Sequence, residues 1–291
     1  MKRTRLFCTL TLAALVLAGC KGEEKLPSNV TANPAERAPI DDPASQIWSV
    51  PQESQVTLMP QQVTYPMIKE QAVQFMRVKA MADEHWVAIR LEWEDKTQSD
   101  ALEVDKFTDA VAVEIPLGDP AKTNPMMGDA QNPVYLCHWK AAWQRDVDKG
   151  RTDVQDLHPG YWADPYPFVA GGHPYNVQDG FQSANARRYM PGVAAGNPVS
   201  KIYRQWPVEE LHATGFGSLA DHRFQDARGK GFWKDGKWTV VLAIPREVAD
   251  PSNPKLGKKS TVKLAFAVWD GGAQNVGGRK QWAPFVDLVL P

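Results

Sequence analysis

The chain has 291 residues, with 33 Lys and Arg against 34 Asp and Glu, so its formal net charge is −1. A balance this close to zero provides no basic field that could hold a polyanion, which excludes a nucleic-acid-binding protein. The length is compatible with one large domain behind a leader segment. Three cysteines, at positions 8, 20 and 137, exclude a disulfide-stapled scaffold.

The N-terminus has the pattern of a bacterial lipoprotein signal. Three basic residues open the chain and are followed by an apolar run, Leu6–Leu17. This run has the length of a signal-peptide core and is shorter than the roughly 20 apolar residues that span a bilayer. Residues 17–20 read Leu-Ala-Gly-Cys and resemble a lipobox. We therefore expect residues 1–19 to be a signal peptide and Cys20 to carry a lipid, the alternative being a plain cleaved signal.

The residue after Cys20 bears on the membrane to which the lipid would attach. It is Lys21 and not Asp, which in enterobacterial-type sorting favours the outer membrane. We expect a lipid-anchored protein on the periplasmic side of a bacterial membrane, with the outer membrane favoured. Loss of residues 1–19 removes three of the 33 basic side chains and none of the 34 acidic ones, so the mature net charge would be −4.

Residues 20–51 are rich in proline and contain few large apolar residues before Trp48. Such a segment buries too little apolar surface to offset the conformational entropy lost on folding. We therefore predict a tether over residues 20–51 and a folded domain over residues 52–291. The alternative is a proline-rich arm that lies on the domain surface.

Apolar and polar residues alternate with a period of two through much of the predicted domain, which is typical of half-buried strands. The clearest strands are expected at Val87–Trp93, Val111–Ile115, Tyr135–Trp139, Trp238–Ile244, Val262–Val268 and Phe285–Leu290. Asp235-Gly236 predicts a tight hairpin turn, because glycine accepts a positive φ. Only Pro207–Ala213 has a helix-like pattern. These features predict a mainly β fold, an antiparallel β-sandwich with few short helices.

The alternation stops over about residues 150–200, which contain many glycines, prolines and aromatic residues. This stretch is too long and too apolar for a simple connection, so we predict a long irregular insertion packed over the domain. Such an insertion would cap a pocket, form a partner surface or only cover a sheet edge.

Motifs of the common enzyme classes are absent from the sequence. The six histidines lack HxxxH or HExxH spacing, and no GxSxG elbow, P-loop or GxGxxG after a strand occurs. Three acidic residues, Glu92, Glu94 and Asp95, lie at a strand end, where we expect a solvated turn. Cys137 alternates into a strand pattern, which indicates a buried and inert thiol. Eight tryptophans near the strand ends would pack in the core, line a flat cofactor slot or form a sugar platform.

Several longer motifs carry a family resemblance in their order and spacing. They are LEWEDKT (91–97), FTDAVAV (107–113), MGD (127–129), VYLCHWKAAW (134–143), GFGSL (215–219), WKDGKW (233–238) and AFAVWDG (265–271). The chain resembles the haem-binding γ subunit of ethylbenzene dehydrogenase and, in the same family, those of dimethyl sulfide dehydrogenase, selenate reductase and chlorate reductase. The resemblance covers most of residues 85–290 apart from the insertion.

This resemblance implies a β-sandwich that holds one haem b between a methionine and a lysine. By motif position the iron ligands would be Met127, directly before Gly128, and Lys280, directly after Gly-Gly-Arg. Met126 is the alternative thioether, and Lys234 and Lys237 are the alternative amines. The family passes electrons between a molybdenum-cofactor catalytic subunit with its iron–sulfur subunit and a soluble carrier such as a c-type cytochrome. The chain would then be an electron-transfer subunit and not itself an enzyme.

Two protein ligands on one haem iron leave no open position for substrate or oxygen, which favours electron transfer. A haem-free β-sandwich lipoprotein that binds carbohydrate is the main alternative, because exposed tryptophans can stack on sugar rings. A haem-free scaffold for a periplasmic complex is a third. The Met127 and Lys280 pair separates these hypotheses, since a sugar-binding protein has no need of it.

Overall fold

The computed structural model describes residues 26–101, 103–150, 158, 160, 184–195, 197, 200, 204–248, 250 and 252–291. The predicted signal peptide, the lipobox with Cys20 and most of the predicted insertion lie outside these residues. Within the insertion the described residues include two short helices, α4 (Ala184–Tyr189) and α5 (Pro191–Ala194). Among the described helices, none has the length and apolar character of a membrane span.

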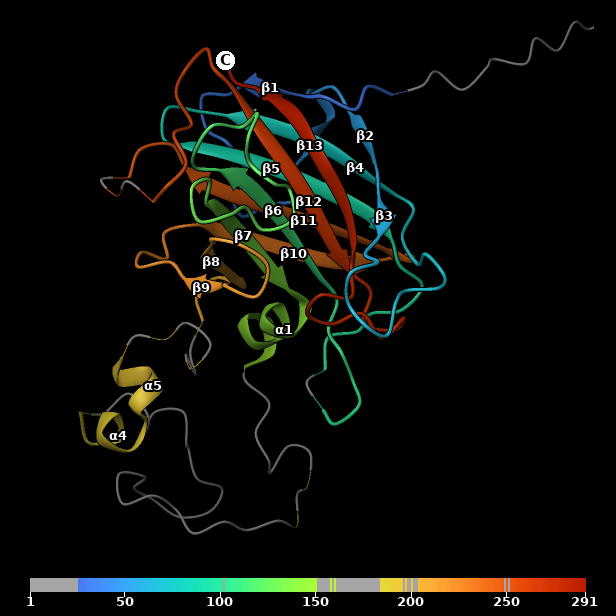
Figure 1. Ribbon diagram of the computed structural model, residues 1–291, viewed down its shortest axis with the longest axis vertical. Coiled ribbons are helices and arrows are strands. Elements are labelled where there is room, and N and C mark those ends of the chain that lie inside the picture. Colours follow the sequence, from blue (N-terminus) through green and yellow to red (C-terminus); the bar gives the residue numbers. More distant parts are fainter. Residues whose placement is uncertain are drawn as a thin grey trace, which may run out of the picture.

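Strands make up most of the regular secondary structure in the described residues (Figure 1). Besides α4 and α5, the helical elements are the 3-10 turn η1 (Gln46–Ser49) and α1 (Ala141–Lys149). The strands are β1 (Val30–Pro34), β2 (Ser54–Thr57), β3 (Met59–Pro60), β4 (Phe75–Ala82), β5 (Trp86–Glu94), β6 (Ala110–Pro116), β7 (Val134–Lys140), β8 (Val208–Ala213), β9 (Ala220–Asp221), β10 (Arg228–Lys234), β11 (Lys237–Pro245), β12 (Thr261–Trp269) and β13 (Gln281–Val289).

The strands pair in the order β10-β11-β5-β4-β1-β13-β12-β6-β7-β8-β9. Neighbours are antiparallel except at β1, which runs parallel to both β4 and β13 and so joins two antiparallel halves. The curled sheet folds these halves against each other (Figure 1). Trp139 of one half lies with its ring centroid 4.9 Å from that of Trp238 in the other. The predicted mainly β, sandwich-like fold with few helices is confirmed.

The predicted hairpin turn is confirmed at Asp235 and Gly236, which join β10 to β11 with φ values of 53° and 78°. Both values are positive, as a two-residue turn of this kind requires. Cys137 is fully buried, and burial raises the pKa of its thiol well above the usual range, as expected of an inert residue.

Two local predictions differ from the structure. Pro207–Ala213 is not helical, because Val208–Ala213 forms strand β8 and pairs with β7. Glu209 and Glu210 in this strand are buried, and Glu210 accepts hydrogen bonds from the Tyr135 hydroxyl at 2.7 Å and from the Ala227 amide at 2.6 Å. Tertiary pairing therefore overrides local propensity. Asp95 is only 3% exposed and does not lie in a solvated turn.

The tether predicted over residues 20–51 is wrong from Val30 onward. Val30 is fully buried, and β1 lies between β4 and β13 at the junction of the two halves. Trp48 is also buried, and its indole N–H donates to the Asp42 carbonyl at 3.0 Å. The prolines did not prevent burial, because β1 pairs inside the sheet and Trp48 packs in a second buried cluster, which contains Met81.

Candidate cofactor-binding site

The face of β6, β7 and β12 opposite the core borders a cavity of about 600 Å³. Successive side chains of a strand point to opposite faces of the sheet. On β6, Val111 and Val113 therefore join the core, whereas Ala110 and Ala112 line the cavity. On β12, Ala267 lines a smaller adjoining cavity of about 30 Å³. The alanine side chains leave free the space above the sheet that larger residues would fill.

The walls of the larger cavity are mostly apolar and aromatic. They are formed by Phe107, Leu136, Trp143, Leu211, Phe216, Leu219 and Trp269, among others. An apolar pocket of this size with a few polar groups is typical of sites for organic cofactors, which measure roughly 300–1,000 Å³. The two cavities share several lining residues, including Met127, Phe216, Trp269 and Lys280.

Met127 lies in the loop between β6 and β7, in a backbone conformation that few methionines adopt. Its φ is 76°, and Gly128 follows with a φ of 66°. A Cβ on Gly128 would lie 2.5 Å from the Asn132 carbonyl oxygen, so this position accepts only glycine. The Met127 carbonyl accepts a hydrogen bond from the Gly215 amide at 2.9 Å. These constraints hold the Met127 side chain, 9% exposed, against the cavity.

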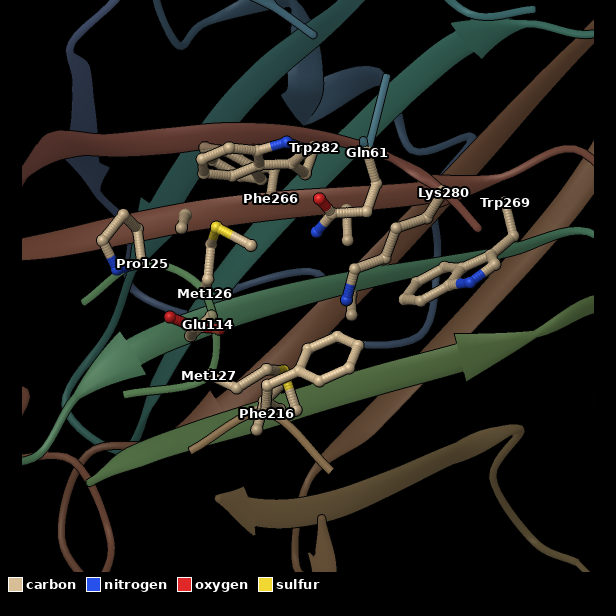
Figure 2. Close-up of a pocket in the computed structure, with 14 residues that line it drawn as sticks. Gln61, Glu114, Pro125, Met126, Met127, Phe216, Phe266, Trp269, Lys280 and Trp282 are labelled. Carbon is tan, nitrogen blue, oxygen red and sulfur yellow. The ribbon is translucent and has the colours of Figure 1, made fainter. Parts of the chain in front are cut away.

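Lys280 precedes β13 and extends toward the loop that carries Met127 (Figure 2). Its carbonyl accepts a hydrogen bond from the Gln61 amide at 2.9 Å, which fixes its backbone. The Lys280 Nζ lies 4.9 Å from the centroid of the Trp269 ring. Within the described part of the chain, this amine has no hydrogen-bond or ion-pair partner. Burial lowers the pKa of Lys280, and the charge of Glu114 opposes that shift.

Glu114 shares the smaller cavity with Lys280 and Met127. Burial raises the pKa of the Glu114 carboxyl to about 8, although the charge of Lys280 and the Met127 amide lower it. Its Oε1 is buried without a hydrogen-bond partner among the described residues. Burial disfavours the charged form of both groups, and the neutral form of the Lys280 amine carries the lone pair that a metal ligand needs.

A polar group interrupts the apolar wall on β7 and β8. The Glu209 Oε1 accepts from the Lys140 Nζ at 2.9 Å and lies 2.9 Å from the His138 Nδ1. Burial opposes ionisation of Glu209, but His138 and Lys140 together hold its pKa at about 2. Burial lowers the pKa of His138, and its Nε2 has no hydrogen-bond partner within the described residues.

The structure brings Met127 and Lys280 together, because both line the same two cavities although they are far apart in the sequence. The alternative Met126 lines only the smaller cavity. Lys234 and Lys237 lie at the β10–β11 turn and line neither. Of the tryptophans, Trp143 and Trp269 face the larger cavity, whereas Trp93, Trp139 and Trp238 pack in the core.

Sequence reasoning missed His138 and the alanines that line the cavities. His138 lies on the face of β7 opposite Cys137 and Trp139, and a lone histidine in an alternating strand gives no local signal of a cavity. The signal for the cavity was the alternation of valine with alanine along β6, since a strand buried on both faces needs small residues beside a ligand.

Comparison with known proteins shows similarity to one family. Residues 45–281 match the ethylbenzene dehydrogenase family. A Haloferax mediterranei protein described as a respiratory nitrate reductase heme subunit is 22% identical over 98% of this chain and 83% of its own length. The chlorate reductase subunit gamma of Ideonella dechloratans is 24% identical over 82% of this chain and 74% of its own.

The similarity of this chain to solved structures is weaker than its similarity to the two relatives above. A family 9 carbohydrate binding module from Caldicellulosiruptor kristjanssonii, in complex with glucose, has a TM-score of 0.38 and 10% identity over 90% of this chain and 95% of its own. A protein from Bacteroides uniformis described as carbohydrate-binding has a TM-score of 0.42 and 8% identity over 90% of this chain and 98% of its own. Scores this low assign no ligand to this chain.

Proposed function

The chain belongs to the ethylbenzene dehydrogenase family, and we propose that it is a haem b-binding electron-transfer subunit of an oxidoreductase complex. The observation that carries this proposal is the Lys280 amine, which lacks a polar partner among the described residues and faces the cavity that Met127 also lines. The names of two relatives, a heme subunit of a nitrate reductase and a γ subunit of chlorate reductase, support it.

The residues at the site fit a porphyrin. A flat apolar ring needs a flat apolar floor, and Ala110 and Ala112 supply one beside aromatic walls such as Trp269. Met127 and Lys280 would hold the iron, the first through its thioether sulfur and the second through a neutral amine. When bound, haem supplies one-electron transfer. With two protein side chains holding the iron, substrate and oxygen would have no place on it, so the subunit would carry electrons and would not itself be an enzyme.

The protein contributes the environment of this site. The lowered pKa of Lys280 favours the neutral amine that a metal ligand needs, and the raised pKa of Glu114, about 8, favours a neutral carboxyl beside it. The constrained backbone at Met127 and Gly128 limits the movement of the thioether. A thioether ligand favours ferrous iron and raises the reduction potential.

We further infer the setting of this subunit. Its partners would be a molybdenum-cofactor catalytic subunit and an iron–sulfur subunit, with a soluble c-type cytochrome or another carrier as the exchange partner. The γ-subunit name of the chlorate reductase relative supports an assembly of several subunits. The lipobox pattern supports a lipid anchor at Cys20 on the periplasmic side of a bacterial membrane, the outer membrane being favoured by Lys21.

The test is a pyridine haemochrome assay with an oxidised-minus-reduced absorption spectrum of the protein expressed in a periplasm. We expect haem b at one per chain and the spectrum of a six-coordinate, low-spin iron. Absence of haem after supplementation would contradict the proposal and favour the carbohydrate-binding alternative, which binding assays with oligosaccharides would then test.

A further inference from the structure

Glu114 is a buried acidic residue in the middle of the sheet face that borders the proposed haem site. It lies on β6, and its cross-strand neighbours are Ala265 on β12 and Leu136 on β7. Residues directly opposite each other in a sheet share one face, so apolar side chains flank the carboxyl on both sides. Glu114 is only 7% exposed. A carboxyl buried in such surroundings is costly unless hydrogen bonds replace the water that it loses.

One side of this carboxyl has a hydrogen-bond donor, and the other has none among the described residues. The Met127 backbone amide donates to the Glu114 carboxyl. The Glu114 Oε1 is buried and has no hydrogen-bond partner within the described residues. Buried oxygens of this kind are rare in native proteins and call for an explanation. Glu114 therefore keeps an acceptor unused beside the smaller cavity, which it lines.

Lys280 has the donor groups that match this acceptor. Its side chain lines the same cavity, and Figure 2 shows Lys280, Glu114 and Met127 around one space. An amine that binds iron through its lone pair still carries two N–H groups, and a buried donor without an acceptor is destabilising. The iron-bound amine would therefore need an acceptor inside the site.

Gln61 is a second polar side chain that lines the smaller cavity. Its backbone amide donates to the Lys280 carbonyl at 2.9 Å, and its Oε1 accepts from the Val63 amide at 3.2 Å. The Gln61 oxygen thus already has a donor, whereas the Glu114 Oε1 has none among the described residues. Of these two side chains, Glu114 is the better acceptor for the amine.

We propose that Glu114 is a positioning residue that connects the two iron ligands. Its carboxyl accepts one hydrogen bond from the Met127 amide and another, directly or through one water, from the iron-bound Lys280 amine. This inference rests on the proposed function, because it assigns Glu114 a role toward an amine that binds iron. It adds a third residue to the site, one that acts on the iron only through its ligands.

The place of Glu114 in the fold suits this role. β6 is an inner strand, paired with β12 on one side and β7 on the other, so its backbone is fixed by hydrogen bonds along both edges. Met127 lies in the loop after β6, and Lys280 directly precedes β13. A carboxyl on a rigid strand would therefore hold two ligands that come from separate loops in one arrangement.

A hydrogen bond from the amine to Glu114 would also change the electronic character of the ligand. Carboxylates that accept from a metal-bound side chain orient it and make its nitrogen a stronger donor. A stronger nitrogen donor favours ferric iron, whereas the Met127 thioether favours ferrous iron. Glu114 would thus lower the reduction potential that the thioether raises.

The test compares wild type with Glu114→Leu and Glu114→Gln. Leucine is similar in size but has no acceptor, while glutamine keeps an acceptor oxygen. Absorbance titration of the haem-free protein should show haem binding about 10–100-fold weaker in Glu114→Leu, as for other lost partners of metal ligands. Its reduction potential should rise, and the g values of its low-spin electron paramagnetic resonance signal should shift. Glu114→Gln should stay closer to wild type in all three measurements.

Gln61→Leu is the matched control, because it removes a different polar side chain from the same cavity. It should keep the wild-type potential and g values. Wild-type values of both in Glu114→Leu would overturn the inference and leave the proposed function intact, since haem would still be bound. An equal shift in Gln61→Leu would also overturn it, because that result indicates the general polarity of the cavity. Absence of haem from the wild type would instead overturn the proposed function and this inference with it.

Discussion

The two faces of β6 and β12 differ although they share one backbone. The core face carries Val111, Val113 and Phe266 and packs against the other half of the sandwich. The opposite face carries alanines, Glu114 and Trp269 and borders the cavities of Met127 and Lys280. One face therefore holds the fold together, whereas the other borders open space and carries polar groups, such as the Glu114 Oε1, that lack partners among the described residues. Substitutions on the two faces should therefore have separable effects on stability and on haem content.

The largest loss of stability is expected on the core face. Trp139 is fully buried between Trp93 and Trp238, with ring centroids at 6.4 and 4.9 Å. Trp139→Ala should reduce the free energy of unfolding by about 3–5 kcal/mol, as aromatic truncations in cores do. Denaturant unfolding of the haem-free protein measures this. Trp269→Ala on the cavity face is the control and should cost clearly less, and an equal loss would contradict the separation of the two faces.

Glu114 is expected to make the free energy of unfolding fall as pH rises, an effect of intermediate size. Its pKa is raised to about 8 in the folded protein from an ordinary value near 4.5. The folded state therefore holds a proton that the unfolded state has released, and the stabilising contribution present below pH 4.5 is lost as pH rises to about 8. The slope would be on the order of 1 kcal/mol per pH unit. Unfolding of the haem-free protein from pH 5 to 8 should show a flatter dependence in Glu114→Gln; an unchanged slope would contradict the raised pKa.

A substitution at Ala112 is expected to have the smallest effect on the free energy of unfolding and a large effect on the haem content. Ala112→Leu adds three carbons into the cavity without disturbing the core face. Unfolding free energy should change by less than about 1 kcal/mol, while the haem content falls sharply because the added atoms occupy the floor of the site. Haem per chain, measured by absorbance, checks this. Ala112→Ser, of similar size, should keep its haem, and full haem content in Ala112→Leu would place the porphyrin elsewhere.

Much of the fold could be predicted from the sequence, because alternation along β5, β6, β7, β11 and β12 is a local signal. β1 and β8 could not be predicted from the sequence, because their structure depends on pairing with other strands. For the site, spacing alone did not connect Met127 with Lys280; the family resemblance did, and the sheet order explains why the two meet. His138 was missed, and Asp95 was wrongly expected in a solvated turn, because burial of a polar residue is a tertiary property that the chain does not display locally.

The most direct test of the central claim is the low-temperature electron paramagnetic resonance and absorption spectrum of Met127→Ala and Lys280→Ala, beside Met126→Ala. We expect the wild-type protein and Met126→Ala to give the same low-spin signal. Loss of either ligand should replace that signal with a high-spin one or abolish haem binding. A wild-type low-spin spectrum in Met127→Ala or in Lys280→Ala would contradict the proposal that these two residues hold the haem iron.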